Sequence, residues 1–180
     1  ASIGGLLVVD EAYAEFSSEI SAVTLIAQYP NVIVIRTMSK AFAFAGARLG
    51  YLIADPAVID ALQLVRLPYH LSAITQAVAE VALSFSDELL AGVDTLIAQR
   101  EIVQAGLSKL GLNITPSAAN FLLFGGFNQP ADQLWQKLLD RGILIRDVGL
   151  LGQLRVTIGT AAENQAFLSA LTEVLAEGDK

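Results

Sequence analysis

The chain has 180 residues and no cysteine, which excludes thiol catalysis, disulfides and thiolate metal sites. Its single histidine, His70, also excludes paired-histidine chemistry and histidine-rich metal sites. The formal net charge is −7 and no cluster of Lys or Arg occurs, which argues against a nucleic-acid partner. Apolar residues make up 54% of the chain, but charges or turn residues interrupt every apolar run well short of a membrane span. We therefore expect no membrane partner.

Buried parallel strands account for this apolar content, because helices cover both of their faces. Short aliphatic runs over 6–9 and 32–36 predict two such strands, and residues 49–54 predict a third. No signal peptide is recognisable, so we expect a soluble, cytoplasmic protein. The chain enters its first strand without an initiator methionine, which suggests a fragment or a processed piece.

The remaining elements of the first half are mostly helical. We predict, in chain order, a short amphipathic segment over 17–29, helices over 56–66 and 73–84 joined by a linker, and a long helix over 86–110. Pro56 suits a first helical turn, Ser72 can cap the next helix, and Gly111 ends the long one.

The second half has shorter elements. The pattern predicts strands over 112–115, 120–124, 142–146 and 154–158, with helices over 130–140 and 161–177. This order is typical of a small α+β domain. The fold class is therefore α/β, with three parts: the C-terminal part of a large α/β domain with a mostly parallel sheet over 1–85, a connecting helix over 86–111, and a small α+β domain over 112–180.

Lys40 is the first candidate functional residue. It follows the second strand and is surrounded in sequence by Ala, Phe and Gly, where desolvation disfavours the ammonium and favours a nucleophilic amine. An amine that forms Schiff bases is the natural partner of a carbonyl cofactor, above all pyridoxal phosphate (PLP). Thr37, Ser39 and Arg48 offer hydroxyls and a guanidinium for its phosphate. The alternative is a surface lysine at a strand end, with Arg48 paired to a carboxylate.

Two acids and a tyrosine follow the first strand. The carboxyl ends of parallel strands are where open α/β sheets bind ligands. Asp10 could form a salt bridge with a protonated ring nitrogen, and Tyr13 could donate a hydrogen bond nearby. In the alternative interpretation, Asp10 and Glu11 merely open a loop or cap a helix.

Two arginines interrupt apolar strands of the second half. Arg146 closes the predicted strand 142–146, and Arg155 lies inside the predicted strand 154–158. A buried guanidinium needs an anionic partner, because an unpaired buried charge is costly. That partner is either an internal carboxylate, such as Asp147, or an anionic ligand. Two such arginines favour a substrate with two anionic groups.

These residues lie in motifs that resemble one family along the whole chain. The motifs are VVDEAY (8–13), RTMSKAF (36–42), AGARLGY (45–51), SAANF (117–121), GILIRD (142–147) and LRVTIG (154–159). They are similar to those of the fold-type I PLP-dependent aminotransferases and, more narrowly, of the branch that acts on histidinol phosphate. The resemblance implies amino transfer between glutamate or 2-oxoglutarate and histidinol phosphate or imidazole acetol phosphate, in histidine biosynthesis.

The resemblance also implies a role for each matching residue. Lys40 would form the Schiff base with PLP and later carry the proton between the substrate Cα and the cofactor. Asp10 would keep the pyridine nitrogen protonated, and Tyr13 would bind the ring hydroxyl. The cofactor phosphate would be held by Ser39 and Arg48, with Thr37 nearby.

On the substrate side, the resemblance implies that Arg155 binds the α-carboxylate. Arg146 would bind the phosphate of histidinol phosphate, or the side-chain carboxylate of glutamate in the other half-reaction. Asn120, just before a predicted strand, is placed with them as a substrate-binding residue.

Members of this family are about twice as long as this chain and form homodimers, so the resemblance implies a homodimeric parent enzyme. Their other half supplies a phosphate-binding loop, an aromatic residue stacked on the ring and an asparagine. Other functions remain open: an aromatic aminotransferase, a PLP-dependent decarboxylase of a phosphorylated amino acid, a non-catalytic effector-sensing domain, or a folded but inert fragment.

Overall fold

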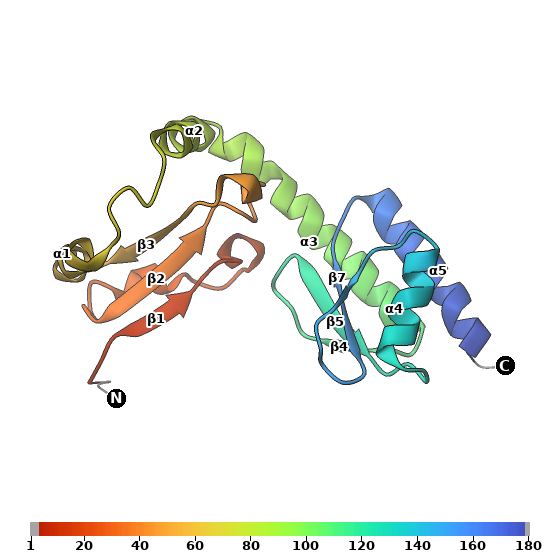
Figure 1. Cartoon of the computed structure of the whole chain (residues 1–180). Helices are drawn as coiled ribbons and strands as arrows, with labels where there is room; N and C mark the ends of the chain where they lie inside the picture. The colour runs from red at the N-terminus through yellow and green to blue at the C-terminus, as the bar shows by residue number, and fades with distance from the viewer. Residues whose placement is uncertain (1–3, 179–180) are drawn as a thin grey trace. The chain divides into compact units, whose positions relative to one another are not determined.

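The structure is a computed structural model that describes residues 4–178. The chain divides into two compact units, Ala1–Val93 and Asp94–Lys180, each with its own β-sheet (Figure 1). Among the described residues, no helix combines the length and apolar character needed to cross a membrane.

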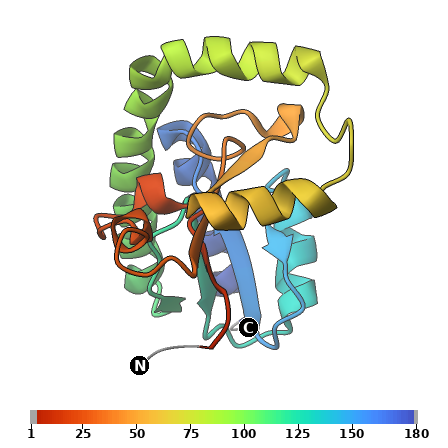
Figure 2. The ribbon, with the colours of Figure 1, turned by 90° about the vertical axis from the view of Figure 1, so that its left-hand side faces the viewer.

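The sheet of the first unit has three strands in the order β1-β2-β3. They are β1 (Leu7–Asp10), β2 (Val32–Thr37) and β3 (Gly50–Ala54). β1 and β2 pair in parallel, as predicted, whereas β3 runs antiparallel to β2 (Figure 2). β3 reverses direction because a compact loop, and no crossover helix, connects it to β2. The α/β class is confirmed, with one parallel and one antiparallel pairing in this sheet.

The predicted helices of the first half are confirmed. They are α1 (Pro56–Val65), α2 (Ala73–Ser84) and the long α3 (Ser86–Lys109). Asp55 caps α1 by accepting a hydrogen bond from the Ala57 N–H, and Pro56 occupies the first turn. The Ser72 side chain caps α2 in the same way.

The segment 17–29 is less regular than predicted. The loop between β1 and β2 holds only two short 3₁₀ helices, Ala14–Phe16 and Ala22–Leu25. Ser21 caps the second one, and the first backbone N–H of that turn is bound by the Glu11 carboxylate at 2.6 Å. Because a helix leaves its first N–H groups without internal partners, both contacts cap this turn, which ends at Leu25.

The second unit contains an antiparallel sheet in the order β4-β5-β7-β6. Its elements are β4 (Asn113–Thr115), β5 (Phe121–Gly125), α4 (Ala131–Asp140), β6 (Arg146–Asp147), β7 (Gln153–Thr157) and α5 (Ala161–Gly178). Leu122 and Phe124 of β5 and Leu154 and Val156 of β7 are buried on one face of the sheet. The alternate residues of both strands therefore lie on the opposite face.

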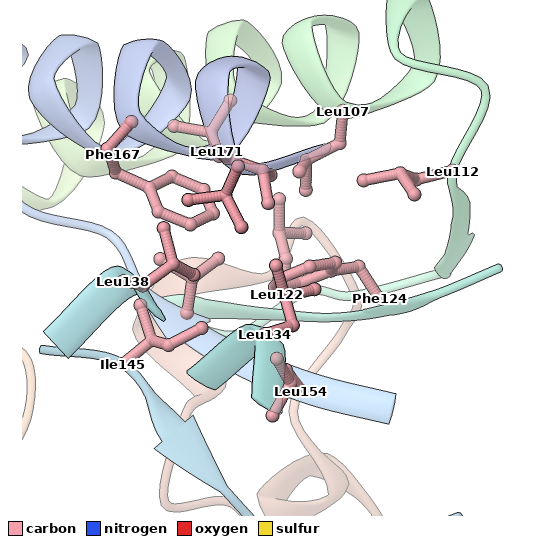
Figure 3. Packing of buried hydrophobic residues seen from close by; sticks show 14 of the residues in the cluster. Leu107, Leu112, Leu122, Phe124, Leu134, Leu138, Ile145, Leu154, Phe167 and Leu171 are labelled. Atoms are coloured by element: carbon pink, nitrogen blue, oxygen red, sulfur yellow. The ribbon is translucent and has the colours of Figure 1, made fainter. Parts of the chain in front are cut away.

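One hydrophobic core holds the second unit together (Figure 3). Helix α3 contributes Val103 and Leu107, and the Phe124 ring meets the Phe167 ring edge-on at 5.9 Å. The other buried members come from β5, β7, α4, α5 and positions next to strand ends: Leu112, Leu122, Leu134, Leu138, Ile145, Leu154, Val156, Ile158, Ala170, Leu171 and Val174. Trp135 of α4 packs against this core.

The predicted strand 142–146 is only partly formed. Its ladder is limited to Arg146 and Asp147 of β6. The preceding residues are held by α4 instead: the Ile143 N–H donates to the Leu138 carbonyl at 2.9 Å, and Trp135 Nε1 donates to the Ile145 carbonyl at 2.9 Å. Backbone groups satisfied by a helix and an indole are not free for a strand partner.

Candidate active site

The residues predicted to hold a cofactor gather at one edge of the first sheet. Asp10 ends β1 and Thr37 ends the parallel β2, so both lie at the same edge. Thr37 pairs with Gly50 at the start of β3, which places Arg48 at this edge as well. Strand pairing thus places Asp10 and Arg48, which are 38 positions apart in the sequence, at the same edge of the sheet.

Lys40 lies in the loop after β2, which is pinned by buried neighbours. Met38, Ala41 and Phe42 are buried, and the Phe44 N–H donates to the Met38 carbonyl. Lys40 itself is exposed, so the expected desolvation by its apolar neighbours is not found within this chain. The reason is that those neighbours turn inward and leave the lysine on the outside of the loop.

The Lys40 ammonium has an aromatic neighbour from the loop after β1. Its Nζ lies 5.4 Å from the centroid of the Tyr13 ring, within the range of a cation–π contact. The Tyr13 ring also contacts Phe16, which is buried. The loops that follow β1 and β2 therefore meet at the Lys40 amine.

Thr37, Ser39 and Arg48 lie together on the same loop. The Thr37 hydroxyl donates to the Leu49 carbonyl at 3.2 Å and accepts from the Ser39 N–H at 3.1 Å. Arg48 Nη1 donates to the Ala45 carbonyl, and its backbone adopts a left-handed φ of 53°. No carboxylate of the described part of the chain lies within ion-pair distance of Arg48. The alternative of an internal ion pair is thus not found.

Asp10 closes a tight turn. Its Oδ1 accepts a hydrogen bond from the Ala12 N–H at 3.0 Å, as the loop-opening interpretation expects. The side chain is exposed at the sheet edge. Asp10 can hold this turn and also bind a cofactor, because a carboxylate accepts several hydrogen bonds through its two oxygens.

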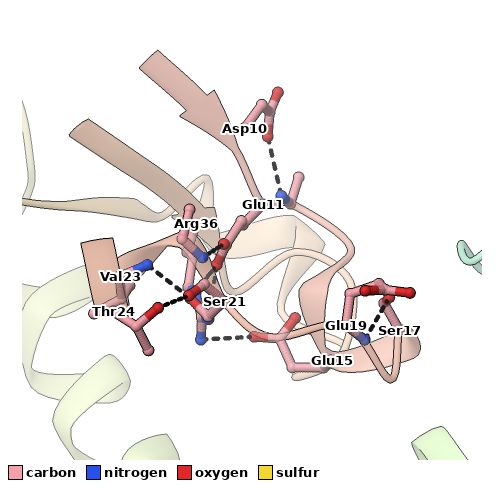
Figure 4. A network of polar contacts seen from close by, with 11 residues as sticks. Asp10, Glu11, Glu15, Ser17, Glu19, Ser21, Val23, Thr24 and Arg36 are labelled. Carbon is pink, nitrogen blue, oxygen red and sulfur yellow. Dashed lines mark hydrogen bonds and ion pairs between the residues drawn. The ribbon is translucent and has the colours of Figure 1, made fainter. Parts of the chain in front are cut away.

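Glu11 and Arg36 form a hydrogen-bonded ion pair beside this edge (Figure 4). Burial raises the pKa of Glu11, but hydrogen bonds from Ser21, from the Ala22 N–H and from Arg36 outweigh it, so this pKa lies below its usual value. Burial conversely lowers the pKa of Arg36, and the hydrogen bonds and charges of Glu11 and Tyr51 more than restore it, so that pKa is raised. Both groups are therefore charged near neutral pH.

The two arginines predicted to bind substrate, Arg146 and Arg155, are direct neighbours. Arg146 of β6 and Arg155 of β7 are register partners in an antiparallel ladder, so both side chains leave the same face of the sheet. The flanking Leu154 and Val156 are buried in the core, which places Arg155 on the opposite face. Asp147 forms no ion pair with either arginine, and its Oδ1 accepts a hydrogen bond from the Gly149 N–H.

Arg155 has an aromatic support and an unsatisfied donor. Its guanidinium carbon lies 4.9 Å from the centroid of the Phe121 ring on β5. Its Nε is buried without a hydrogen-bond partner. Within the described residues, no carboxylate lies within ion-pair distance of Arg146 or Arg155. Two adjacent like charges and a free buried donor are the features of an anion site.

Asn120 immediately precedes β5. Its carbonyl accepts a hydrogen bond from the Ile158 N–H at 2.9 Å, which extends the pairing of β5 with β7. The Ser117 hydroxyl bonds to the Phe121 carbonyl and shapes the preceding turn. Asn120 is therefore fixed at the end of the two strands that carry Phe121 and Arg155.

The structure thus forms two groups of predicted site residues, a cofactor group in the first unit and an arginine pair with Asn120 in the second. No cluster of three or more potential metal ligands occurs among residues 4–178. The sequence analysis missed Glu11 and Arg36 as a pair, and Phe121 as the support of Arg155. The available signal was position: Glu11 follows one strand end, and Arg36 lies at the end of the adjacent parallel strand.

Comparison with known proteins defines the family. The family model for aminotransferase class I and II matches residues 1–171, and the chain belongs to this family. A histidinol-phosphate aminotransferase of Mycolicibacterium smegmatis is 62% identical over 172 residues, which cover 95% of this chain and 45% of the relative. The histidinol-phosphate aminotransferase of Nocardia farcinica is 63% identical over 165 residues, which cover 91% of this chain and 43% of the relative. The chain therefore spans less than half the length of these relatives.

Solved structures agree with the α/β fold. Histidinol-phosphate aminotransferase from Sinorhizobium meliloti, in complex with pyridoxal-5'-phosphate, aligns with a TM-score of 0.82 and 32% identity over 96% of this chain and 49% of that one. The histidinol-phosphate aminotransferase from Clostridium acetobutylicum aligns with a TM-score of 0.83 and 27% identity, over 96% of this chain and 55% of that one.

Proposed function

We propose that this chain is the lysine-bearing part of a PLP-dependent aminotransferase that acts on histidinol phosphate and 2-oxoglutarate in histidine biosynthesis. The observation that carries the proposal is the Arg146–Arg155 pair: two adjacent guanidinium groups with a free buried donor and, among residues 4–178, no carboxylate within ion-pair distance. Histidinol phosphate and glutamate both offer anionic groups to such a pair. The identity of 62% with the Mycolicibacterium smegmatis enzyme supports this substrate choice.

The residues at the first sheet edge fit PLP by their chemistry. A carboxylate suits a protonated ring nitrogen, a phenol suits the ring hydroxyl, and hydroxyls with an arginine suit a phosphate. We assign these roles respectively to Asp10, Tyr13, and the group of Thr37, Ser39 and Arg48. When bound, PLP supplies an electron sink that stabilises negative charge at the substrate Cα.

Lys40 is the residue that we assign to proton transfer. Its amine is the one basic side chain of the loop after β2 that also faces the Tyr13 ring. It would anchor the cofactor and take the proton from the substrate Cα as a general base. Its exposure in this chain leaves the amine accessible to cofactor and substrate.

Arg155 and Arg146 would orient the substrate. Phe121 and the flanking core residues hold Arg155 in place, so its fork is prepared for a carboxylate. Arg146 is exposed beside it and would bind the phosphate, or the distal carboxylate of glutamate. Asn120 would add an amide at the end of the same strands.

The test is amino transfer in a chimaera in which this chain replaces the matched segment of the Mycolicibacterium smegmatis relative. We expect amino transfer from histidinol phosphate to 2-oxoglutarate, and its loss in the Lys40→Ala variant. Phenylpyruvate as competing acceptor separates the aromatic aminotransferase alternative. A clear preference for phenylpyruvate over imidazole acetol phosphate would contradict the substrate assignment, and activity that survives Lys40→Ala would contradict the site.

We also propose a cytoplasmic location and a homodimeric parent enzyme, both of which the family resemblance supports. Light scattering of the same chimaera after size exclusion tests the dimer. A monomeric, fully active chimaera would contradict it.

A further inference from the structure

We infer that Glu11 and Arg36 are a positioning pair for the cofactor site, an inference that rests on the proposed function. Neither residue is among those assigned to cofactor or substrate. Their contacts nevertheless join the end of β1 to the end of β2, the two strand ends that carry the proposed site (Figure 4).

The Glu11 carboxylate receives four hydrogen bonds. Arg36 donates to its Oε2 from both Nε, at 3.1 Å, and Nη2, at 2.8 Å. The Ser21 hydroxyl donates to the same oxygen at 2.8 Å, and the Ala22 N–H donates to Oε1 at 2.6 Å. Arg36 Nη2 also binds the Ser21 hydroxyl at 3.0 Å, and its Nη1 lies 3.8 Å from Glu15 Oε1. The pair thus fixes three segments: the end of β1, the end of β2 and the loop between them.

Each member of the pair is adjacent in sequence to a proposed site residue. Glu11 follows Asp10, and Arg36 precedes Thr37 in the strand that leads to Lys40. The loop held by Ser21 also carries Tyr13, whose ring faces the Lys40 amine. The ion pair therefore sets the distance between the Asp10 carboxylate and the Lys40 amine, which would bind opposite ends of the PLP ring.

Arginine is required at this position on geometric grounds. Its planar fork delivers two N–H groups to one carboxylate oxygen and a further contact to Ser21. A lysine would keep the charge but has a single point of attachment, so it would leave the loop less constrained. Arg36→Lys is accordingly expected to behave like a loss of the pair.

The experiment compares the 180-residue chain with Arg36→Gln, Arg36→Lys and Glu11→Gln. The matched control is Arg141→Gln, which removes the ion pair of Arg141 with Glu177 in the other unit. Hydrogen exchange is followed by mass spectrometry, at a temperature at which circular dichroism shows every variant to be folded. In parallel, each protein is incubated with PLP, reduced with borohydride and mapped for pyridoxyl-lysine.

We expect exchange to accelerate in both segments 11–22 and 37–43 for the three pair variants, with β5 and β7 unchanged. Labelling of Lys40 should fall at least about tenfold, because small displacements of reacting groups have large effects on rate. Labelling of Lys109 and Lys137 should stay constant in the same samples. Arg141→Gln should match the unsubstituted chain in the exchange of 11–22 and 37–43 and in the labelling of Lys40.

Two results would overturn the inference. One is faster exchange confined to 11–22, which would show that the pair does not reach the lysine loop. The other is undiminished Lys40 labelling in folded variants, as expected for a merely structural ion pair. Failure of the proposed function gives a different pattern: the unsubstituted chain itself then shows no preference for Lys40 over Lys109 and Lys137.

Discussion

At the scale of single residues, the adjacent arginines of the second sheet are the feature that links stability to function. Arg146 and Arg155 are direct cross-strand partners, and no carboxylate of the described residues lies within ion-pair distance of either one. Like charges placed opposite each other on a sheet are destabilising. A protein retains such a pair where the two charges serve a ligand, which is the general trade between stability and function.

Removal of one of these charges should therefore stabilise the ligand-free chain. We expect Arg146→Gln to raise the unfolding free energy by roughly 0.2–1 kcal/mol at low salt, and the gain should shrink as salt screens the repulsion. Urea unfolding at two salt concentrations measures it. Arg141→Gln is the control: it loses an attractive ion pair with Glu177, so it should be neutral or destabilising. A destabilised Arg146→Gln would mean that Arg146 is paired within the protein.

Ala43 provides a second prediction at this scale, since its φ of 52° is left-handed. An L-residue there carries strain of roughly 1–2 kcal/mol, whereas glycine adopts the conformation freely. We expect Ala43→Gly to be neutral or stabilising by up to about 1 kcal/mol, because the entropy of the unfolded chain offsets part of the relief. Ala45→Gly, in a 3₁₀ turn with negative φ, should be destabilising in the same urea titration. Equal losses in both variants would contradict the assigned backbone conformation.

At the scale of elements, the junction of β1 and β2 depends on an ionised Glu11. The pKa of Glu11 is lowered by folding from its ordinary value of 4.5. A group with a lowered folded pKa adds stability above its unfolded pKa, and this contribution is lost as pH falls through the folded pKa. The pH range in which the stabilisation by Glu11 is lost therefore lies below pH 4.5.

We expect Glu11→Gln to cost about 1–3 kcal/mol near pH 7, the range for removing one partner of a charged hydrogen bond. The difference from the unsubstituted chain should narrow as the pH falls below 4.5. Chemical unfolding across this pH range measures both quantities. A difference that stays constant with pH would show that Glu11 is not a charged partner of Arg36.

The core elements follow from sequence more directly than the loops. Leu154 and Val156 alternate with polar residues along β7, and such alternation identifies a buried sheet face from sequence. β5 is apolar at every position from 121 to 124, so its sequence predicts a strand but does not show that Leu122 and Phe124 are the buried pair. We expect Phe124→Ala to destabilise the second unit by about 3–5 kcal/mol, because Phe124 is 1% exposed and its ring contacts Phe167. Thermal unfolding followed by circular dichroism checks this, with the exposed Leu144→Ala as control. A small effect would mean that the core repacks around the lost ring.

Elements that depend on distant partners could not be predicted in this way. Residues 142–146 have the composition of a strand, yet a carbonyl of α4 accepts the Ile143 N–H and the Trp135 indole donates to the Ile145 carbonyl. The segment 17–29 has helical spacing, yet its one regular turn, Ala22–Leu25, is a short 3₁₀ helix capped by Ser21 and Glu11. In both cases groups outside the segment contact its backbone, and the periodicity of the segment itself does not reveal these contacts.

At the scale of the whole molecule, local patterns and family motifs indicate the same candidate residues, and the motifs add Asn120. Strand ends predicted the edge shared by Asp10 and Thr37, because parallel strands align their carboxyl ends. The direct pairing of Arg146 with Arg155 depends on strand register, which spacing along the chain does not give. The exposure of Lys40 agrees with the alternative of a surface lysine and not with the expected desolvation, since its apolar neighbours in sequence turn away from it.

The first unit leaves much apolar surface exposed. Val8 of β1 is 52% exposed, Ile35 of β2 is 41% exposed, and Leu64 of α1 is 87% exposed. The chain spans 45% of the length of its Mycolicibacterium smegmatis relative. We expect the isolated chain to bind the dye ANS strongly and the chimaera to bind it weakly, because large exposed apolar patches are binding surfaces. Equal dye fluorescence from both, at equal concentration, would show that the added segment does not cover this surface.

The central claim is that Lys40 is the cofactor-bearing lysine, and one measurement tests it most directly. The chimaera is incubated with PLP, reduced with borohydride and digested, and the pyridoxyl group is located by mass spectrometry. This chain offers four lysines, namely Lys40, Lys109, Lys137 and Lys180. The account predicts one label per chain, on Lys40 alone, and its disappearance in Lys40→Ala. Label spread over the other lysines, or a stoichiometric label that survives Lys40→Ala, would contradict it.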